Sequence, residues 1–197
     1  MADDQTIKIY DDRAADYAER FASENTGDPL LTAFIDACPA GGRVLDLGCG
    51  PGASAALMAK SGLVVDALDA SAEMVAMAAK HPGVTARQAR FEEVGGEAIY
   101  DGIWANFSLL HAARSTLPHI LAALHMALKP GGRLHVAMKL GEGEARDDIG
   151  RLYTYVTESE LEGLLTTVGF TITDKRFGSG AGLDGGISHW IQVTAHG

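Results

Sequence analysis

A glycine-rich turn at residues 46–52, Asp-Leu-Gly-Cys-Gly-Pro-Gly, is the segment best suited to chemistry. It ends a short apolar run that begins at Val44, and it precedes a stretch typical of a helix. Glycine adopts positive φ angles at little cost and lets a ligand touch the backbone, while the start of a helix presents free N–H groups and a positive dipole end. The turn therefore predicts a binding site for a nucleotide-like ligand.

A single acidic residue, Asp69, ends the next apolar run and could complete this site. A carboxylate there can accept both hydroxyl protons of a ribose, and each bond to a charged acceptor contributes roughly 1.5–3 kcal/mol. The turn, the acid and the strand–turn–helix context together predict a nucleoside-binding site. The simpler alternative for Asp69 is a solvent-exposed strand end.

Two classes of cofactor fit this arrangement. Gly48, Gly50 and Ala53 satisfy the G-x-G-x-x-G/A pattern, so an NAD(P)-dependent oxidoreductase is one hypothesis. Asp46, however, would set a negative charge against a pyrophosphate, and Pro51 removes an N–H from the turn that should hold phosphates. These two residues favour a nucleoside that carries an amino acid in place of a pyrophosphate.

The elements that must position these groups alternate along the chain. Strands are expected at 44–47, 63–69, 84–89, 101–106 and 133–139, and helices at 53–61, 72–80, 117–128 and 158–168. This alternation implies a mostly parallel sheet with helices on both faces. Two final segments, 170–177 and 187–195, lack an intervening helix and predict an antiparallel pair at one edge. We expect a Rossmann-like open α/β sheet with its ligand at the carboxyl ends of the strands.

Residues 1–38 are expected to form a helical cap, and residues 39–197 the ligand-binding domain. One apolar helix face carries Ala14, Tyr17, Ala18 and Phe21. Asp11 or Asp12 is the expected N-cap of that helix, and residues 29–37 predict a second one.

Composition excludes several classes of protein. With 47% apolar and 21% charged residues the chain is typical of a globular protein, and its net charge of −10 argues against nucleic acid or an anionic membrane as a partner. Two cysteines are too few for a disulfide framework, and no metal-ligand spacing is present, so no metal is expected. The N-terminus lacks an apolar run, which predicts a soluble cytoplasmic protein.

Taken in order, these segments resemble the motifs of class I S-adenosylmethionine-dependent methyltransferases. Residues 44–52 are similar to the first motif of the family, 68–74 to the segment with the ribose-binding acid, 100–111 to the fourth-strand motif, and 128–132 to the turn before the fifth strand. The resemblance covers the chain from about residue 10 to its end. Within the family, small bacterial members of the tellurite-resistance-like kind are the most similar.

The resemblance implies S-adenosyl-L-methionine as methyl donor, S-adenosyl-L-homocysteine as product and a small-molecule acceptor. It places the glycine-rich turn at the methionine part of the cofactor, Asp69 at the ribose, and Ala70 and Met74 beside the adenine. Where many members have an adenine-binding Asp, this chain has Arg90, which cannot accept a hydrogen bond, so backbone groups of Arg90 and Phe91 are expected there. The implied cofactor-binding set is Asp46, Gly48, Gly50, Gly52, Asp69, Ala70, Met74, Arg90, Phe91, Asn106 and Tyr17.

The catalytic group is left open. The candidates are His111, Arg146, Arg151 and Tyr153. His111 stands where the family often has a histidine, but it could instead bond only to backbone. Methyl transfer needs no obligatory strong base, because the cofactor carries the reactivity. A non-catalytic S-adenosylmethionine-binding protein and a related transferase of another group also remain open, as does the oligomeric state.

Residues 139–155 leave the fifth strand and are either a substrate-binding lid or a surface loop. Three cations, Lys139, Arg146 and Arg151, suggest an anionic acceptor, since arginine can hold an oxyanion bidentately. The alternative is that the acidic residues between 142 and 148 neutralise these cations within the loop.

Overall fold

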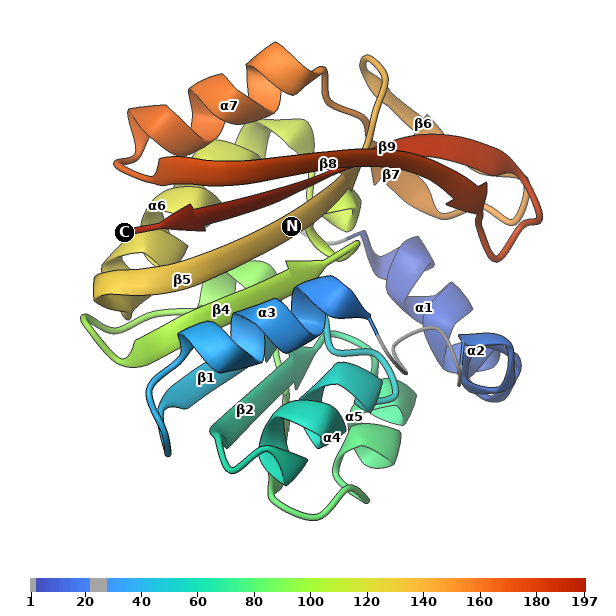
Figure 1. Cartoon of the computed structure of the whole chain (residues 1–197). Helices are drawn as coiled ribbons and strands as arrows, with labels where there is room; N and C mark the ends of the chain where they lie inside the picture. Colours follow the sequence, from blue (N-terminus) through green and yellow to red (C-terminus); the bar gives the residue numbers. More distant parts are fainter. Residues whose placement is uncertain (1–2, 22–27) are drawn as a thin grey trace.

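The computed structural model describes residues 3–21 and 28–197, in which helices cover both faces of a central sheet (Figure 1). In that part of the chain the central sheet has seven strands. From one edge to the other they are β3 (Val84–Gln88), β2 (Val64–Asp69), β1 (Arg43–Leu47), β4 (Tyr100–Asn106), β5 (Leu128–Lys139), β9 (Ile187–His196) and β8 (Thr171–Ala181). The predicted Rossmann-like α/β sheet is confirmed.

The strand order places a switch point between β1 and β4. The chain moves outward from β1 through β2 to β3 and then crosses back to β4, so the loops after β1 and β4 lead to opposite faces. Leu45 of β1 lies between Asp66 of β2 and Ile103 of β4, and these three strands are parallel. In open α/β sheets, ligands bind at such a point.

The C-terminal hairpin forms the opposite side of the sheet. β9 runs antiparallel to both β5 and β8, which confirms the predicted antiparallel edge pair. The register sets Lys139 opposite Trp190. Gly178 and Gly180 lie between the two predicted strand segments, but in the structure they belong to β8 and pair with Trp190 and Ser188 of β9.

Two apolar clusters hold helices on the two faces of the sheet. One face carries α3 (Pro29–Ala37), α4 (Ala53–Lys60) and α5 (Ala72–Ala78). The other carries α6 (Leu117–Ala127) and α7 (Glu158–Thr167). Ser71 caps α5, because its side chain accepts a hydrogen bond from the backbone N–H of Met74.

Two short helices, α1 (Asp4–Asp12) and α2 (Ala14–Phe21), lie beside the carboxyl ends of the parallel strands (Figure 1). The predicted N-cap at Asp11 or Asp12 is wrong, because both residues belong to α1, which Asp3 caps. Asp11 instead accepts a hydrogen bond of 2.6 Å from Ser71 Oγ.

Within residues 1–38, the predicted cap, α3 packs against the sheet through Leu31 and Phe34, whereas α1 and α2 lie beside the carboxyl ends of the parallel strands (Figure 1). Residues 1–2 and 22–27 of that segment, and the side chain of Phe21, lie outside the described part of the chain. The division of the chain at residue 38 stays a prediction.

The segment after β5 folds into a small hairpin of β6 (Glu144–Arg146) and β7 (Leu152–Thr154). Single 3-10 turns complete the connections, at η1 (Phe91–Glu93), η2 (Leu109–His111) and η3 (Arg114–Thr116). Across residues 3–21 and 28–197, no helix is long and apolar enough to span a bilayer.

Candidate active site

The glycine-rich turn between β1 and α4 is shaped by positive φ angles and close packing. Gly48 has φ 70° and Gly50 has φ 53°. A Cβ atom on Gly48 would lie 2.3 Å from Cβ of Ser108, so only glycine fits there. The N–H groups of Gly48 and Cys49 donate to Leu68 O at 2.7 and 2.9 Å, which ties the turn to the end of β2.

Asp69, the last residue of β2, is fixed by backbone donors on both sides. Its Oδ2 accepts from the N–H of Gly50 and its Oδ1 from the N–H of Ser71, each at 2.9 Å. Burial raises the pKa of Asp69, and these two N–H groups oppose that rise. Each carboxylate oxygen keeps a lone pair for a ligand hydroxyl.

Asp69 faces a small cavity of about 80 Å³, here called the Asp69 cavity. Its wall is formed by α1, the glycine-rich turn, the start of α5 and the loops after β3 and β4. The lining residues are Thr6, Ile7, Tyr10, Tyr17, Gly48, Gly50, Asp69, Ala70, Ser71, Met74, Phe91, Asn106, Phe107, Ser108 and His111.

Asp46 faces a second small cavity on the other side of the turn, here called the Asp46 cavity, which Tyr17, Asn106 and Phe107 also line. The side chain is only 3% exposed, and among the described residues Oδ2 has no hydrogen-bond partner. Burial raises the pKa of Asp46 to about 7. His135 Nε2 donates to Asn106 Oδ1 at 3.1 Å, which orients the Asn106 amide at the cavity wall.

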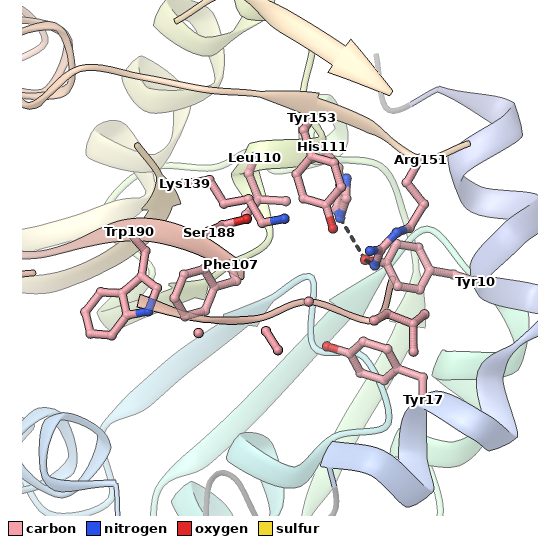
Figure 2. A pocket seen from close by; sticks show the side chains of 14 residues that line it. Tyr10, Tyr17, Phe107, Leu110, His111, Lys139, Arg151, Tyr153, Ser188 and Trp190 are labelled. Atoms are coloured by element: carbon pink, nitrogen blue, oxygen red, sulfur yellow. Dashed lines mark hydrogen bonds between the residues drawn. The ribbon is translucent and has the colours of Figure 1, made fainter. Parts of the chain in front are cut away.

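A larger cavity of about 290 Å³, here called the Lys139 cavity, opens beside the Asp69 cavity (Figure 2). The two share Tyr10, Tyr17, Phe107 and His111, so they adjoin through these side chains. The Lys139 cavity is lined by Tyr10, Tyr17, Phe107, Leu110, His111, Lys139, Arg151, Tyr153, Gly180, Ala181, Gly182, Leu183, Ser188 and Trp190.

A chain of hydrogen bonds crosses the wall shared by these cavities. His111 Nδ1–H donates to Leu152 O at 2.7 Å, so Nε2 accepts from the Tyr10 hydroxyl at 2.8 Å. Arg151 Nη1 donates to that hydroxyl at 2.9 Å (Figure 2). Nη2 of the same guanidinium is paired with Asp147 Oδ2 at 2.7 Å. Burial lowers the pKa of His111 to about 3, so its imidazole is neutral at physiological pH.

Most of the expected cofactor residues meet in this region. Eight line the Asp69 cavity, namely Tyr17, Gly48, Gly50, Asp69, Ala70, Met74, Phe91 and Asn106, and Asp46 lines the adjoining one. Gly52 lines none of these cavities. It has φ 85° before α4, and a Cβ there would lie 2.8 Å from Ala78, so packing accounts for the glycine.

Arg90 lies apart from that group. Its side chain pairs with Asp4 and lines a separate surface pocket, and its N–H donates to the Glu93 carboxylate at 2.6 Å. Of Arg90 and Phe91, whose backbone groups were expected at the adenine, only Phe91 lines the Asp69 cavity.

Among the expected catalytic candidates, His111, Arg151 and Tyr153 line the Lys139 cavity, whereas Arg146 does not. Arg146 pairs with Asp3 through two hydrogen bonds of 2.8 and 3.0 Å, outside the cavity. This contact joins residues far apart in sequence, so the loop composition could not reveal it.

Two aromatic residues of the wall were missed. Phe107 lines all three cavities and has φ 53°, an unusual conformation for a residue other than glycine. Trp190 lines the Lys139 cavity from β9, with its ring edge-on to Phe107 at 6.1 Å. The position of Phe107 directly after β4 was the one available signal, because strand ends face the switch point.

The comparisons with known proteins agree on one protein family. The model of the family described as "Methyltransferase domain" matches residues 15–175. An uncharacterized methyltransferase from Synechocystis sp. is 29% identical over 73% of this chain and 73% of its own. A trans-aconitate 2-methyltransferase from Methylobacterium nodulans is 38% identical over 64% of this chain, which spans 48% of that relative.

A ubiquinone biosynthesis O-methyltransferase from Xanthomonas axonopodis pv. citri is 35% identical, with 56% of this chain matching 49% of the relative. The chain therefore spans about half the length of these last two relatives. Among solved structures, the 1,6-didemethyltoxoflavin-N1-methyltransferase of Burkholderia thailandensis, with bound 1,6-didemethyltoxoflavin and S-adenosylhomocysteine, superposes with a TM-score of 0.78 and 25% identity over 98% of this chain and 87% of its own.

The residues present fit the cofactor that this family uses. The fixed carboxylate of Asp69 suits a ribose, and the unpartnered Oδ2 of Asp46 suits a cationic amino group. A pyrophosphate would instead meet the Asp46 carboxylate, which disfavours the dinucleotide hypothesis. The chain belongs to the methyltransferase domain family and is a class I S-adenosylmethionine-dependent methyltransferase.

Proposed function

We propose that this chain transfers a methyl group to a small molecule held in the Lys139 cavity, with S-adenosylmethionine extending through the Asp69 and Asp46 cavities. The observation that carries the proposal is the shared wall, because Tyr10, Tyr17, Phe107 and His111 face both the Asp69 and the Lys139 cavity. When bound, the cofactor supplies an electrophilic methyl group. The protein residues then need only to align the acceptor and exclude water.

For the cofactor, we assign roles by cavity. Asp69 accepts the ribose hydroxyls, while Met74 and Phe91 cover the adenine. Asp46 and the glycine-rich turn hold the methionine part. The fixed geometry of Asp69 supports the first of these assignments most directly, since two backbone N–H groups orient its oxygens.

For the acceptor, the cavity favours a small, flat molecule. A volume of about 290 Å³ is at the lower end for ligand pockets, and the rings of Phe107, Tyr153 and Trp190 form much of its wall. The relatives named for trans-aconitate and 1,6-didemethyltoxoflavin act on small molecules of this scale. The lysine in the wall supports an acceptor with negative charge or an acidic group, whereas Arg151 is paired with Asp147.

The experiment is a screen of small-molecule pools for S-adenosylhomocysteine formation, preceded by calorimetry with S-adenosylmethionine, S-adenosylhomocysteine and NAD. We expect binding of the first two and product formation with acidic aromatic pools. NAD binding without nucleoside binding would refute the proposal. Binding of S-adenosylmethionine without turnover on any pool would favour the non-catalytic alternative.

A further inference from the structure

Lys139 occupies an unusual place for a lysine. It is the last residue of β5, is only 9% exposed, and lines the Lys139 cavity opposite Trp190 in the sheet register (Figure 2). Its Nζ lies 3.8 Å from the centre of the Tyr153 ring. In the described part of the chain, Nζ has neither a hydrogen bond nor an ion-pair partner within 4.0 Å. The face of the Tyr153 ring stabilises this ammonium, but it has no hydrogen-bond acceptor among the described residues, so an acceptor supplied by a ligand would be favourable.

The other cation of the wall is already neutralised. Arg151 donates to Asp147 Oδ2 from both Nε and Nη2, at 2.9 and 2.7 Å, and its remaining Nη1 donates to Tyr10. Among the described residues that line the cavity, Lys139 is therefore the cation whose charge is not paired with a carboxylate.

No carboxylate lines the Lys139 cavity within residues 3–21 and 28–197. Among acidic residues, Asp184 has the largest electrostatic influence on Lys139, and it favours the charged form of the ammonium. It stands in the β8–β9 turn, where Oδ1 accepts from the N–H of Gly186 at 3.2 Å. Of the other titratable groups of the wall, His111 is neutral and bonded to Tyr10, and burial raises the pKa of Tyr153.

We propose that the methyl acceptor is a small aromatic anion, bound with its negative charge against the Lys139 ammonium and its ring among Phe107, Tyr153 and Trp190. This inference rests on the proposed function and adds the charge state and class of the acceptor. A phenolate, an aromatic carboxylate and a deprotonated ring N–H share this chemistry.

The reaction then needs no proton acceptor. A lone pair on the ionised oxygen or nitrogen of the acceptor forms the new bond to the methyl carbon, the carbon–sulfur bond breaks, and its electron pair stays on sulfur. The acceptor anion and the sulfonium cation both become neutral, so charge balances without a proton transfer. His111 is not needed as a base, since Nε2 is engaged by Tyr10.

The competing role for Lys139 is that of a general base. Burial lowers the pKa of its ammonium, so a neutral amine could remove a proton from a neutral acceptor. Arginine separates these roles, because it keeps a positive charge but cannot lose its proton in a protein.

The test measures binding to the chain saturated with S-adenosylhomocysteine. The probes are two pairs of matched ring compounds, benzoate with benzamide and 4-nitrophenol with 4-nitroanisole, in calorimetry above and below the pKa of the phenol. The variants are Lys139→Met and Lys139→Arg, and Lys60→Met is the matched control at an exposed position on α4.

We expect each anion to bind the wild-type chain and Lys60→Met at least about tenfold more tightly than its neutral partner, as one charge-assisted contact provides. Lys139→Met should abolish the preference, and Lys139→Arg should retain it. The absorbance of 4-nitrophenol should show the bound phenol ionising at lower pH than the free phenol in wild type, and not in Lys139→Met.

Equal affinity for the anions and their neutral partners in wild type, or a preference that survives Lys139→Met, would overturn the inference. Preferential binding of the neutral partners would overturn it as well. Affinity for S-adenosylhomocysteine and the melting temperature are measured on every variant. If wild type does not bind S-adenosylhomocysteine, the proposed function fails; if it binds and turns over without an anion preference, only this inference fails.

Discussion

The hydroxyl of Tyr10 in α1 lies 2.8 Å from Nε2 of His111 in η2, and this bond joins the N-terminal helix to the wall between the Asp69 and Lys139 cavities. Arg151 Nη1 donates to the same hydroxyl, so one oxygen links three segments that are distant in sequence. α1 therefore forms one wall of the Asp69 cavity, and Arg151, which lies between β6 and β7, holds this helix in place. Both cavities depend on that contact, because Tyr10 lines each of them.

Tyr10→Phe should weaken cofactor binding and lower stability. The change removes two hydrogen bonds and leaves the buried His111 Nε2 without a donor, which costs about 1–3 kcal/mol. Calorimetry with S-adenosylhomocysteine and denaturant unfolding measure the two effects. Tyr155→Phe serves as the control, because Tyr155 lines neither cavity. Equal behaviour of the two variants would show that the Tyr10–His111 bond does not hold α1 in place.

Asp69→Ala should weaken cofactor binding by about 2–4 kcal/mol, roughly 30- to 1000-fold, because two charged hydrogen bonds to the ribose are lost. The same change leaves the N–H groups of Gly50 and Ser71 without their partner, so the melting temperature should also fall. Asp69→Asn is therefore the second variant, because its Oδ1 retains one of these backbone contacts. If Asp69→Asn binds S-adenosylhomocysteine as tightly as wild type, Asp69 does not hold the ribose.

Asp46 should make stability fall as pH rises. Its pKa is raised by burial from 3.8 in the unfolded chain to about 7 in the folded one, so the native state holds the proton more tightly. The corresponding stability is complete below pH 3.8 and is lost by about pH 7, a difference on the order of 4 kcal/mol.

Asp46→Asn removes this dependence, and the comparison with wild type isolates it. His111 and His135, whose pKa values are lowered to about 3, act with the opposite sign in both proteins and cancel in the difference. Urea unfolding between pH 4 and pH 8 measures it. A constant difference between wild type and Asp46→Asn across that range would contradict the prediction.

Arg151→Ala and Arg146→Ala should differ clearly in how much they lower the free energy of unfolding. Arg151→Ala breaks a fully buried ion pair with Asp147 and should cost about 3–5 kcal/mol, because a charge is left buried without its partner. Arg146→Ala, at an exposed pair with Asp3, should leave the melting temperature nearly unchanged and the acceptor KM unaltered. A raised acceptor KM in Arg146→Ala would return that residue to the list of acceptor ligands.

The strands, most helices and the cofactor end of the site could be predicted from local patterns. Apolar runs and turn glycines are local signals, and so the positions of Asp46 and Asp69 at strand ends followed directly. The helix that precedes α2 could not, because Asp11 and Asp12 are plausible N-caps for a helix at Ala14. Both instead lie in α1, which Asp3 caps, and Asp11 bonds to Ser71 in a contact distant in sequence.

The acceptor end could be predicted only in part, for a similar reason: Lys139, Arg151 and Tyr153 were candidates, but the wall that they share with Trp190 was not predicted. Lys139 and Trp190 meet only because β9 inserts beside β5, and the sequence does not state that register. Gly52 was assigned to the cofactor by position, yet its environment is the packing of α4 on α5.

Phe107 gives the site a further property, because its ring lines the Lys139, Asp69 and Asp46 cavities together. A ligand that settles this ring in one cavity also shapes the wall of the others. If cofactor and acceptor occupy these cavities as proposed, their affinities should be coupled, and the coupling is reciprocal: the factor by which the cofactor changes acceptor binding equals the factor by which the acceptor changes cofactor binding. Such coupling requires no movement of the sheet.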